Sequence, residues 1–293
     1  MGDAPMYRMI AIDLDGTLLS PSGKVSPRTK SAIHSALEAG WLICFATGRN
    51  LTESRDILED VAHYPTAVFA GGAMVIDTDQ EVTLHQTMMD GDLAREVCAL
   101  LESMGQAVLA LQDTHATGID YLITDDVEVN EATRSWMAVT RSRVVRTPRL
   151  REASHEHTVR LGIVAPVALV DQAMAALKKN FGSRLFWHSL RLPSSGLQVL
   201  EIFDPAVNKW QGVLHVARRH GIEADEIVAI GDDVNDLPML RGAGLGVAMG
   251  NASPEIQASA KRVIGPNSEE GLAAFLEELI AARAVKPEPT AGG

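Results

Sequence analysis

Three stretches of polar residues each come directly after a short apolar run, a pattern typical of a buried strand that ends at a polar loop. The stretches are residues 13–17, 47–49 and 231–236. In an open parallel sheet, ligands bind beyond the carboxyl ends of the strands, because the loops of neighbouring strands meet there. We therefore expect the three stretches to line one crevice.

Two of these stretches are rich in aspartate, and carboxylates that converge on one crevice repel each other. They raise each other's pKa unless a cation neutralises them. Mg²⁺ suits this task because it is a hard ion that takes few carboxylates, keeps some of its water and leaves room for a phosphate oxygen. The sequence therefore predicts a magnesium site that could receive a phosphorylated substrate.

A carboxylate beside a phosphomonoester can attack phosphorus and form an acyl phosphate, which divides one slow hydrolysis into two easier steps. Asp13 is our candidate nucleophile, and Asp15 could act first as acid toward the leaving oxygen and then as base toward water. Phosphoryl transfer otherwise depends on positioning and on stabilising the phosphoryl oxygens. Thr47, the Gly48 amide and Lys209 are candidate groups for that role.

A scaffold of alternating strands and helices is needed to position these loops. Residues 9–12 and 41–46 are predicted strands, and between them Ser26 and Pro27 start a predicted helix that ends at Gly40. A strand, a helix and a second strand require a crossover and hence a parallel sheet. Further predicted helices are 51–62, 209–220 and 268–283, and further predicted strands are 66–69, 226–230 and 245–249. The pattern predicts a doubly wound, Rossmann-like parallel sheet of the α/β class.

The middle of the chain shows more strands per helix. Predicted strands there are 106–111, 121–124, 158–164, 184–187 and 198–203, and predicted helices are 93–104, 130–139 and 167–179. This texture predicts an α+β cap inserted into the α/β core. We expect residues 1–84 and 205–293 to form the catalytic core and residues 85–204 to form the cap, which would govern substrate specificity.

Composition limits the function classes. The 293 residues exceed the size at which one core usually stops growing, which favours two domains. The 46% hydrophobic and 22% charged residues are near globular averages. Lys and Arg number 26 against 38 Asp and Glu, a net charge of −12, so we expect neither nucleic acid nor a membrane surface as a partner.

Further features of the sequence predict the state of the two cysteines and the location of the protein. Cys44 and Cys98 lie in apolar segments, so we expect buried, unreactive thiols. No apolar run approaches the ~18 residues that a transmembrane helix needs. The N-terminal residues show no basic region followed by a cleavable apolar segment. A cytoplasmic location is the default expectation.

The motifs together resemble those of the haloacid dehalogenase-like (HAD) hydrolases of the Cof type. The resemblance rests on Asp-Leu-Asp-Gly-Thr-Leu-Leu at 13–19, Thr-Gly-Arg at 47–49, Asn-Lys at 208–209, Gly-Asp-Asp-Val-Asn-Asp at 231–236 and Gly-Val-Ala-Met-Gly-Asn-Ala at 246–252. The order along the chain matches as well. The resemblance is strong in both core halves, whereas the insert resembles the family's type-two cap by topology only.

This resemblance implies a Mg²⁺-dependent phosphatase that hydrolyses a small phosphorylated metabolite, with a sugar phosphate as the expected class, through an aspartyl phosphate. Asp13 would be the nucleophile and Asp15 the acid and base. The implied metal residues are Asp13, Asp15 through its backbone carbonyl, Asp232 and Asp236, the last supporting either the metal site or Lys209. The implied residues for substrate or phosphate binding are Leu14, Thr47, Gly48, Arg49, Lys209 and Asn235.

Each motif also has an ordinary interpretation. Thr47 could do no more than cap a helix, and Lys209 could be a solvated charge at a helix end. Asp236 could do no more than stabilise the N-terminus of a helix. The turn 71–73 reads Gly-Gly-Ala where the family often has Asn-Gly-Ala, which leaves its role open. The insert's histidines lack a compact ligand spacing, and we expect them to be structural or solvated; they are His115, His155, His157 and His188.

Two other functions remain open at this point. One is a phosphotransferase or phosphomutase that passes the same aspartyl phosphate to a sugar hydroxyl. The other is a non-catalytic metabolite-binding protein. The presence of Asp13, Asp15, Lys209 and Asp232 together counts against it, because a binder has no need of both Asp13 and Asp15. The sequence leaves undetermined whether the chain is a monomer or a homo-oligomer.

Overall fold

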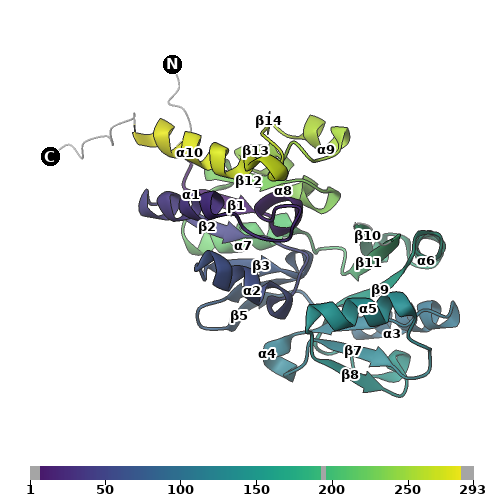
Figure 1. Ribbon diagram of the computed structural model, residues 1–293. Helices are drawn as coiled ribbons and strands as arrows, with labels where there is room; N and C mark the ends of the chain where they lie inside the picture. Colours follow the sequence, from purple (N-terminus) through teal and green to yellow (C-terminus); the bar gives the residue numbers. More distant parts are fainter. Residues whose placement is uncertain (1–6, 193–195, 285–293) are drawn as a thin grey trace.

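The computed structural model describes residues 7–192 and 196–284, and its core contains a five-stranded parallel sheet in the order β14-β13-β12-β1-β2 (Figure 1). The strands are β1 (Met9–Ile12), β2 (Leu42–Phe45), β12 (Ile227–Gly231), β13 (Leu245–Ala248) and β14 (Arg262–Val263). The strand in the middle, β12, and its neighbour β1 come from opposite ends of the chain. The predicted α/β class is therefore confirmed.

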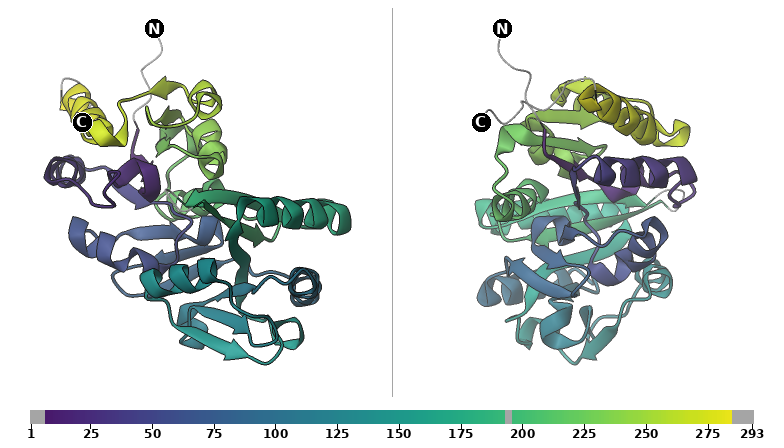
Figure 2. Two further views of the ribbon diagram at one scale, coloured as in Figure 1. Left: turned by 45° about the vertical axis from the view of Figure 1, so that its right-hand side comes forward. Right: turned by 90° about the vertical axis from the view of Figure 1, so that its left-hand side faces the viewer.

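Helices cover both faces of this sheet (Figure 2). They are α1 (Pro27–Glu38), α2 (Leu51–Val61), α7 (Lys209–Arg219), α8 (Leu237–Gly242), α9 (Pro254–Ser259) and α10 (Gly271–Ala284). Ile10, Ile12 and Phe45 pack with α1, α2 and α10 on one face, whereas Met9 and Ala11 pack with α7 and α8 on the other. Successive residues of a strand point to opposite faces, so strands covered on both faces must be apolar throughout.

Local capping explains where the two helices after β1 and β2 begin. Ser26 accepts a hydrogen bond from the Thr29 amide at 3.1 Å, and Pro27 is the first residue of α1, as predicted. Helix α2 is capped by Asn50, which accepts from the Glu53 amide at 2.8 Å, while the Glu53 carboxylate accepts from the Asn50 amide at 3.1 Å. The interpretation of Thr47 as a helix cap is therefore wrong.

A three-stranded antiparallel sheet extends the core beyond β2. It contains β3 (Thr66–Phe69), β4 (Met74–Asp77) and β5 (Val82–Gln86), and a parallel bridge from Ala46 to Val68 connects it to the larger sheet. Only β3 was predicted. The hairpin of β4 and β5 was missed because the apolar run of β4 is only four residues long and follows two glycines, which look like a loop.

The insert forms a six-stranded sheet in the order β10-β11-β9-β6-β7-β8. Its elements are α3 (Gly91–Ser103), β6 (Leu109–Gln112), α4 (Thr114–Thr117), β7 (Tyr121–Thr124), α5 (Glu131–Thr140), β8 (Val144–Thr147), β9 (Thr158–Pro166), α6 (Val167–Asn180), β10 (Phe186–Leu192) and β11 (Leu197–Phe203). The α+β character is confirmed. The strand predicted at 184–187 begins two residues later, because a short helical turn occupies Gly182–Arg184.

The domain boundaries stay a proposal. We propose that residues 1–84 and 205–293 form the core and 85–204 the cap, because all six strands of the insert sheet lie within 85–204. The first boundary falls inside β5, which pairs with β4 of the core. Within the described part of the chain, no helix combines the length and apolar character needed to cross a membrane. Cys44 and Cys98 are free and buried, as predicted.

Candidate active site

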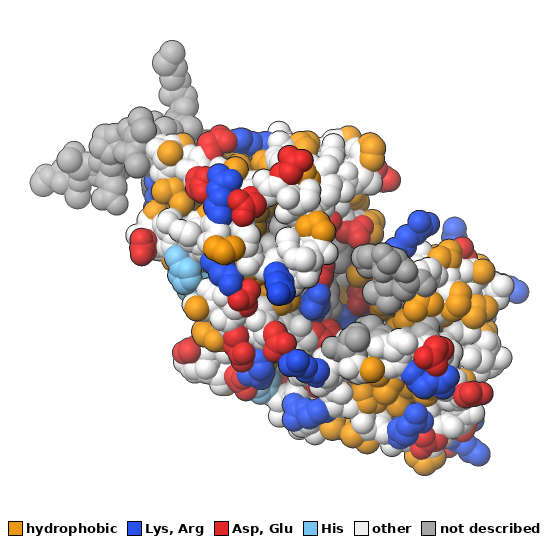
Figure 3. Space-filling model, in the orientation of Figure 1, with side chains coloured by type: hydrophobic (Ala, Val, Ile, Leu, Met, Phe, Trp, Pro, Cys, Tyr) orange, Lys and Arg blue, Asp and Glu red, His pale blue; other side chains and the backbone are white. Residues whose placement is uncertain are grey.

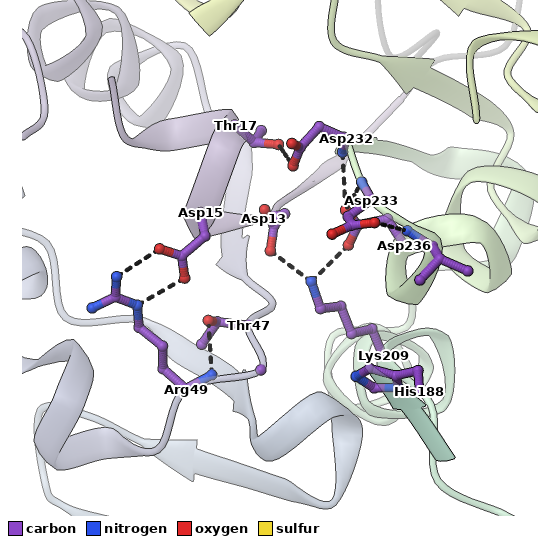
Figure 4. Close-up of polar contacts among 12 residues, drawn as sticks. Asp13, Asp15, Thr17, Thr47, Arg49, His188, Lys209, Asp232, Asp233 and Asp236 are labelled. Carbon is purple, nitrogen blue, oxygen red and sulfur yellow. Dashed lines mark hydrogen bonds and ion pairs between the residues drawn. The ribbon is translucent and has the colours of Figure 1, made fainter. Parts of the chain in front are cut away.

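The exits of three neighbouring core strands carry the site. Asp13 follows β1, Thr47 comes two residues after β2, and Asp232 follows β12. Strand β1 lies between the other two, with Ile12 level with both Phe45 and Ile230, so the three loops start at the same edge of the sheet. Figure 4 shows their side chains gathered around Asp13.

Lys209 enters this cluster from the first turn of α7. Its Nζ donates hydrogen bonds to Asp13 Oδ1 and Asp236 Oδ1, each at 2.6 Å. The lysine is only 1% exposed, and a buried ammonium group requires such partners. The interpretation of Lys209 as a solvated charge at a helix end is therefore wrong.

Asp232 is held by two residues that the sequence analysis left without a role. Thr17 Oγ1 donates to Asp232 Oδ1 at 3.2 Å, and Asn251 Nδ2 donates to Asp232 Oδ2 at 3.2 Å and to the Gly16 carbonyl at 2.9 Å. Both residues lie inside the motifs that carry the family resemblance. Their place in these motifs was the one sequence signal that could have indicated a role, because Thr17 lies far from its partner Asp232 in the sequence.

The carboxylates form a cluster that fits Mg²⁺. Asp13, Asp232 and Asp236 offer oxygen atoms within 4.8 Å of one another. Asp236 is already engaged, since its Oδ1 accepts from Lys209 and its Oδ2 accepts from the amides of Asp232 and Asp233. Each Asp232 oxygen accepts one hydrogen bond and, among the described residues, Asp13 Oδ2 accepts none, so these two side chains keep lone pairs for a cation. Mg²⁺ needs only one or two protein carboxylates. The Asp15 side chain is not part of this cluster.

Charge repulsion within the cluster shifts the carboxyl groups. Burial and the charge of Asp236 raise the pKa of Asp13 well above its ordinary value, against the opposing effect of Lys209. Burial, Asp236 and Asp233 raise the pKa of Asp232 to about 7. Burial lowers the pKa of Lys209, but Asp13 and Asp236 outweigh it, so that pKa lies above its ordinary value. One ammonium does not balance three carboxylates, and a divalent cation would.

Asp15 faces away from this cluster and pairs with Arg49. Arg49 Nε and Nη2 donate to the two Asp15 carboxylate oxygens at 2.8 and 2.6 Å, a bidentate pair. The hydrogen bond to Asp15 raises the pKa of Arg49. The Asp15 side chain is 57% exposed, so it can change partner when a ligand enters.

The remaining predicted binding residues lie in the loops that follow β1, β2 and β12. Thr47 is fully buried, and its hydroxyl accepts from the Arg49 amide at 3.1 Å while keeping its proton for donation. Asn235 Nδ2 lies 3.8 Å from where a Cβ atom of Gly48 would sit, so the two residues are neighbours. The Leu14 side chain is fully buried in the core, which leaves only its backbone for a ligand.

Side chains of the insert also reach this site. Arg160 of β9 donates to the Gly48 carbonyl at 2.7 Å. Glu201 of β11 lies against the same glycine and accepts from His188 of β10 at 2.9 Å. Sequence reasoning assigned no role to Arg160 or Glu201, because only the strand pairing of the insert brings these residues together. His188 is buried.

Comparison with known proteins places the chain among phosphatases. The model of the haloacid dehalogenase-like hydrolase family matches residues 10–276. A pyridoxal phosphate phosphatase of Escherichia coli is 30% identical, over 92% of this chain and 97% of the relative. A 5-amino-6-(5-phospho-D-ribitylamino)uracil phosphatase of Bacillus subtilis is 28% identical, over 93% of this chain and 98% of the relative.

Solved structures share the fold over nearly the whole chain. A haloacid dehalogenase-like hydrolase from Bacteroides thetaiotaomicron has a TM-score of 0.77 at 19% identity, covering 93% of this chain and 99% of its own. A protein from Thermotoga maritima also has a TM-score of 0.77, at 24% identity, covering 93% of this chain and 97% of its own. At these identities the likeness shows the architecture of core and insert.

Proposed function

The chain belongs to the haloacid dehalogenase-like hydrolase family and is a phosphoric monoester hydrolase, and we propose that it releases phosphate from a small phosphorylated metabolite through an aspartyl phosphate on Asp13. One observation carries this proposal: Lys209 is buried between Asp13 and Asp236, next to Asp232. A protein that only binds a metabolite would not need a carboxylate held at the opening by a buried lysine.

In the first step, Asp13 attacks phosphorus. Lys209 fixes the carboxylate through Oδ1, which leaves Oδ2 for the attack. The bond from Oδ2 to phosphorus forms while the bond from phosphorus to the leaving oxygen breaks, and Asp15 donates a proton to that oxygen. Asp15 must first leave Arg49, because the bidentate pair occupies both of its carboxylate oxygens.

In the second step, water attacks phosphorus and Asp15 accepts the proton of that water. The bond from phosphorus to Asp13 breaks, and inorganic phosphate leaves. The Thr47 hydroxyl, the Gly48 amide and Asn235 would hold the phosphoryl oxygens in both steps. Mg²⁺ held by Asp13 and Asp232 would supply positive charge to those oxygens.

The relatives indicate the substrate class. Their names give pyridoxal phosphate, a phosphorylated ribitylaminouracil and HMP-PP as substrates of those proteins. The phosphate group is what these molecules share, and the rest of each molecule differs. We propose a small phosphorylated metabolite as the substrate here, with sugar phosphates as the first class to test.

The test is the Asp13→Asn variant, assayed for phosphate release with Mg²⁺ and a set of phosphorylated metabolites. An amide is not a competent nucleophile, so we expect kcat to fall by at least about 10³-fold while the fold is kept. The exposed Asp60→Asn variant is the control. Substantial activity of Asp13→Asn would remove Asp13 from its role. An isomerised sugar phosphate without free phosphate would favour the phosphotransferase instead.

A further inference from the structure

The face of the insert sheet that is turned to the core carries a cluster of polar residues among apolar ones, which consists of Arg160, His188 and Glu201. In the strand pairing, His188 of β10 is opposite Glu201 of β11, and Glu201 is opposite Gly162 of β9. Arg160 lies two residues before Gly162 and therefore on the same face. The alternate strand residues, such as Leu161 and Leu200, pack with α3 and α6 on the opposite face. The cluster thus belongs to the face that covers the active site.

Glu201 is the centre of this cluster. Its Oε1 accepts a hydrogen bond from Arg160 Nη1, and its Oε2 accepts from His188 Nε2 at 2.9 Å. Glu201 is 4% exposed, and Arg160 and His188 are similarly buried. Burial raises the pKa of Glu201, but Arg160 and His188 outweigh it and hold that pKa below its ordinary value. Glu201 is therefore a carboxylate that is fixed in place and ionised.

The carboxylate lies directly over the turn that is expected to hold the phosphate. Glu201 Oε2 is 3.6 Å from where a Cβ atom of Gly48 would sit, and Arg160 donates to the Gly48 carbonyl at 2.7 Å. A substrate whose phosphate contacts this turn must extend its leaving group past the insert. Figure 3 shows the molecule hollowed between core and insert on this side.

The cluster presents hydrogen-bond acceptors to such a leaving group. A carboxylate has about four lone-pair directions, of which Arg160 and His188 take two. In the tautomer that donates through Nε2, His188 also carries an acceptor at Nδ1, and this buried atom has no hydrogen-bond partner among the described residues. A small pocket next to Glu201 is lined by Leu109, Val164 and Val199. The surface suits a group with an apolar body and hydrogen-bond donors.

We propose that Glu201 is a specificity-determining residue, which accepts a hydrogen bond from a hydroxyl, an amino group or a protonated ring nitrogen of the leaving group. Arg160 and His188 are positioning residues that hold its carboxylate. This inference rests on the proposed phosphatase function and deepens it. The preferred substrates are phosphomonoesters whose leaving group carries hydrogen-bond donors, and leaving groups that carry only a carboxylate are repelled.

The experiment compares wild type with Glu201→Gln, both as the full chain with Mg²⁺. The substrates are polyol phosphates, phosphoethanolamine, p-nitrophenyl phosphate, whose leaving group has no donor, and phosphoglycolate, whose leaving group has only a carboxylate. In wild type, kcat/KM should be higher for the best donor-bearing substrate than for p-nitrophenyl phosphate. The variant should lower that ratio by about 10- to 100-fold, the usual effect of losing a hydrogen bond to a charged group. Phosphoglycolate should become a better substrate.

Two further variants separate specificity from folding. Glu102→Gln removes the charge of another buried glutamate of the insert. Glu102 lies on helix α3 and pairs with Arg151 at 2.7 Å. This variant should leave the ratio unchanged. Glu201→Asp keeps the charge but withdraws it by one methylene, and it should lower the ratio by a smaller factor. This variant also decides the question if Glu201→Gln does not fold, as judged by its melting curve.

Equal loss on all substrates would show that Glu201 only ties the insert to the core, and an unchanged ratio would show that it contacts no leaving group. Either result overturns the inference, as does a wild type that prefers p-nitrophenyl phosphate. A wild type that hydrolyses none of the substrates would overturn the phosphatase function itself, and the inference with it.

Discussion

At the scale of single residues, buried charged side chains of the core and of the insert are paired with neighbours. Lys209 lies between Asp13 and Asp236 in the core, and Glu201 lies between Arg160 and His188 in the insert. A buried pair contributes little net stability compared with an apolar pair, but removing one partner leaves a buried charge uncompensated. These residues are therefore sensitive to substitution in both stability and activity.

Lys209→Met tests this balance. The two carboxylates that accept from Lys209 would then repel each other without a cation between them. We expect the free energy of unfolding to fall by about 3 kcal/mol, at the lower end of the usual cost because Asp13 can take up a proton. We expect kcat to fall by about 10²- to 10³-fold, because the attacking carboxylate loses its hydrogen bond.

Urea unfolding and phosphate-release assays measure these two effects. The matched control is Lys30→Met, which removes a partly exposed lysine at the surface whose partner is Asp60 and should change both quantities little. A Lys209→Met enzyme with wild-type turnover would show that Lys209 has no part in the reaction.

At the scale of the elements, two glycines allow backbone segments to approach the site closely. Gly16 has φ +79°, and a Cβ atom there would lie 2.0 Å from Asp232 Oδ2. Gly72 has φ +109°, and a Cβ atom there would lie 2.1 Å from the Asn208 carbonyl oxygen. The turn 71–73, whose role the sequence left open, therefore lets the start of α7 approach and helps to position Lys209.

Gly16→Ala should displace Asp232, because the new methyl group and the carboxylate cannot occupy the same space. We expect the variant to bind Mg²⁺ at least about 10-fold more weakly, as measured by calorimetry, and to lose most of its phosphatase activity. Positive φ alone costs an alanine about 1 kcal/mol, so a control must separate strain from collision.

Gly23→Ala is that control. Gly23 has a similar φ of +73°, but a Cβ atom there would meet nothing within 4 Å. This variant should show the cost of strain in its melting temperature while Mg²⁺ affinity stays at the wild-type value. Equal loss of Mg²⁺ binding in both variants would contradict the role assigned to Gly16.

At the scale of the whole molecule, the insert is joined to the core around the start of α2. Thr52 donates to Asp120 at 2.8 Å, and the Tyr121 hydroxyl donates to Glu53 at 3.0 Å, next to the contact of Arg160 with Gly48. Helix α2 begins directly after the turn that is expected to bind phosphate. The position of the insert is thus coupled to the geometry of that turn.

Stability of the whole molecule should depend on pH and Mg²⁺ together. The pKa of Asp232 is raised from 3.8 to about 7, so the folded state holds this proton more tightly than the unfolded chain does. Its contribution to stability is present at low pH and is lost as pH rises between about 4 and 7. Mg²⁺ competes with that proton, so it should raise Tm more at about pH 8 than at about pH 5.5.

Thermal melting with Mg²⁺ and with EDTA at both pH values measures this effect. The Asp232→Asn side chain cannot take up the proton, and it offers Mg²⁺ a neutral amide in place of a carboxylate. The rise in Tm on adding Mg²⁺ should therefore be small at both pH values. An increment in wild type that is the same at both pH values would contradict the shifted pKa.

Local patterns in the sequence were enough to predict the fold class and the residues at the three strand exits. Apolar runs that stop at Asp13, Thr47 and Gly231 are local features, and a buried parallel strand must be apolar along its whole length. The family resemblance is also local, because its motifs are short and contiguous. The strand at Tyr121–Thr124 was predicted at its observed bounds, because its residue types are also a local feature of the sequence.

Which charged side chains contact each other depends on the folded chain as a whole. Lys209 reaches Asp13 across nearly two hundred residues, and Asp15 turns to Arg49 rather than to the acidic cluster. Arg160, His188 and Glu201 come together only through the pairing of β9, β10 and β11. Side-chain partners depend on strand order, register and burial, which arise from packing the whole chain, and no local pattern of residue types specifies them.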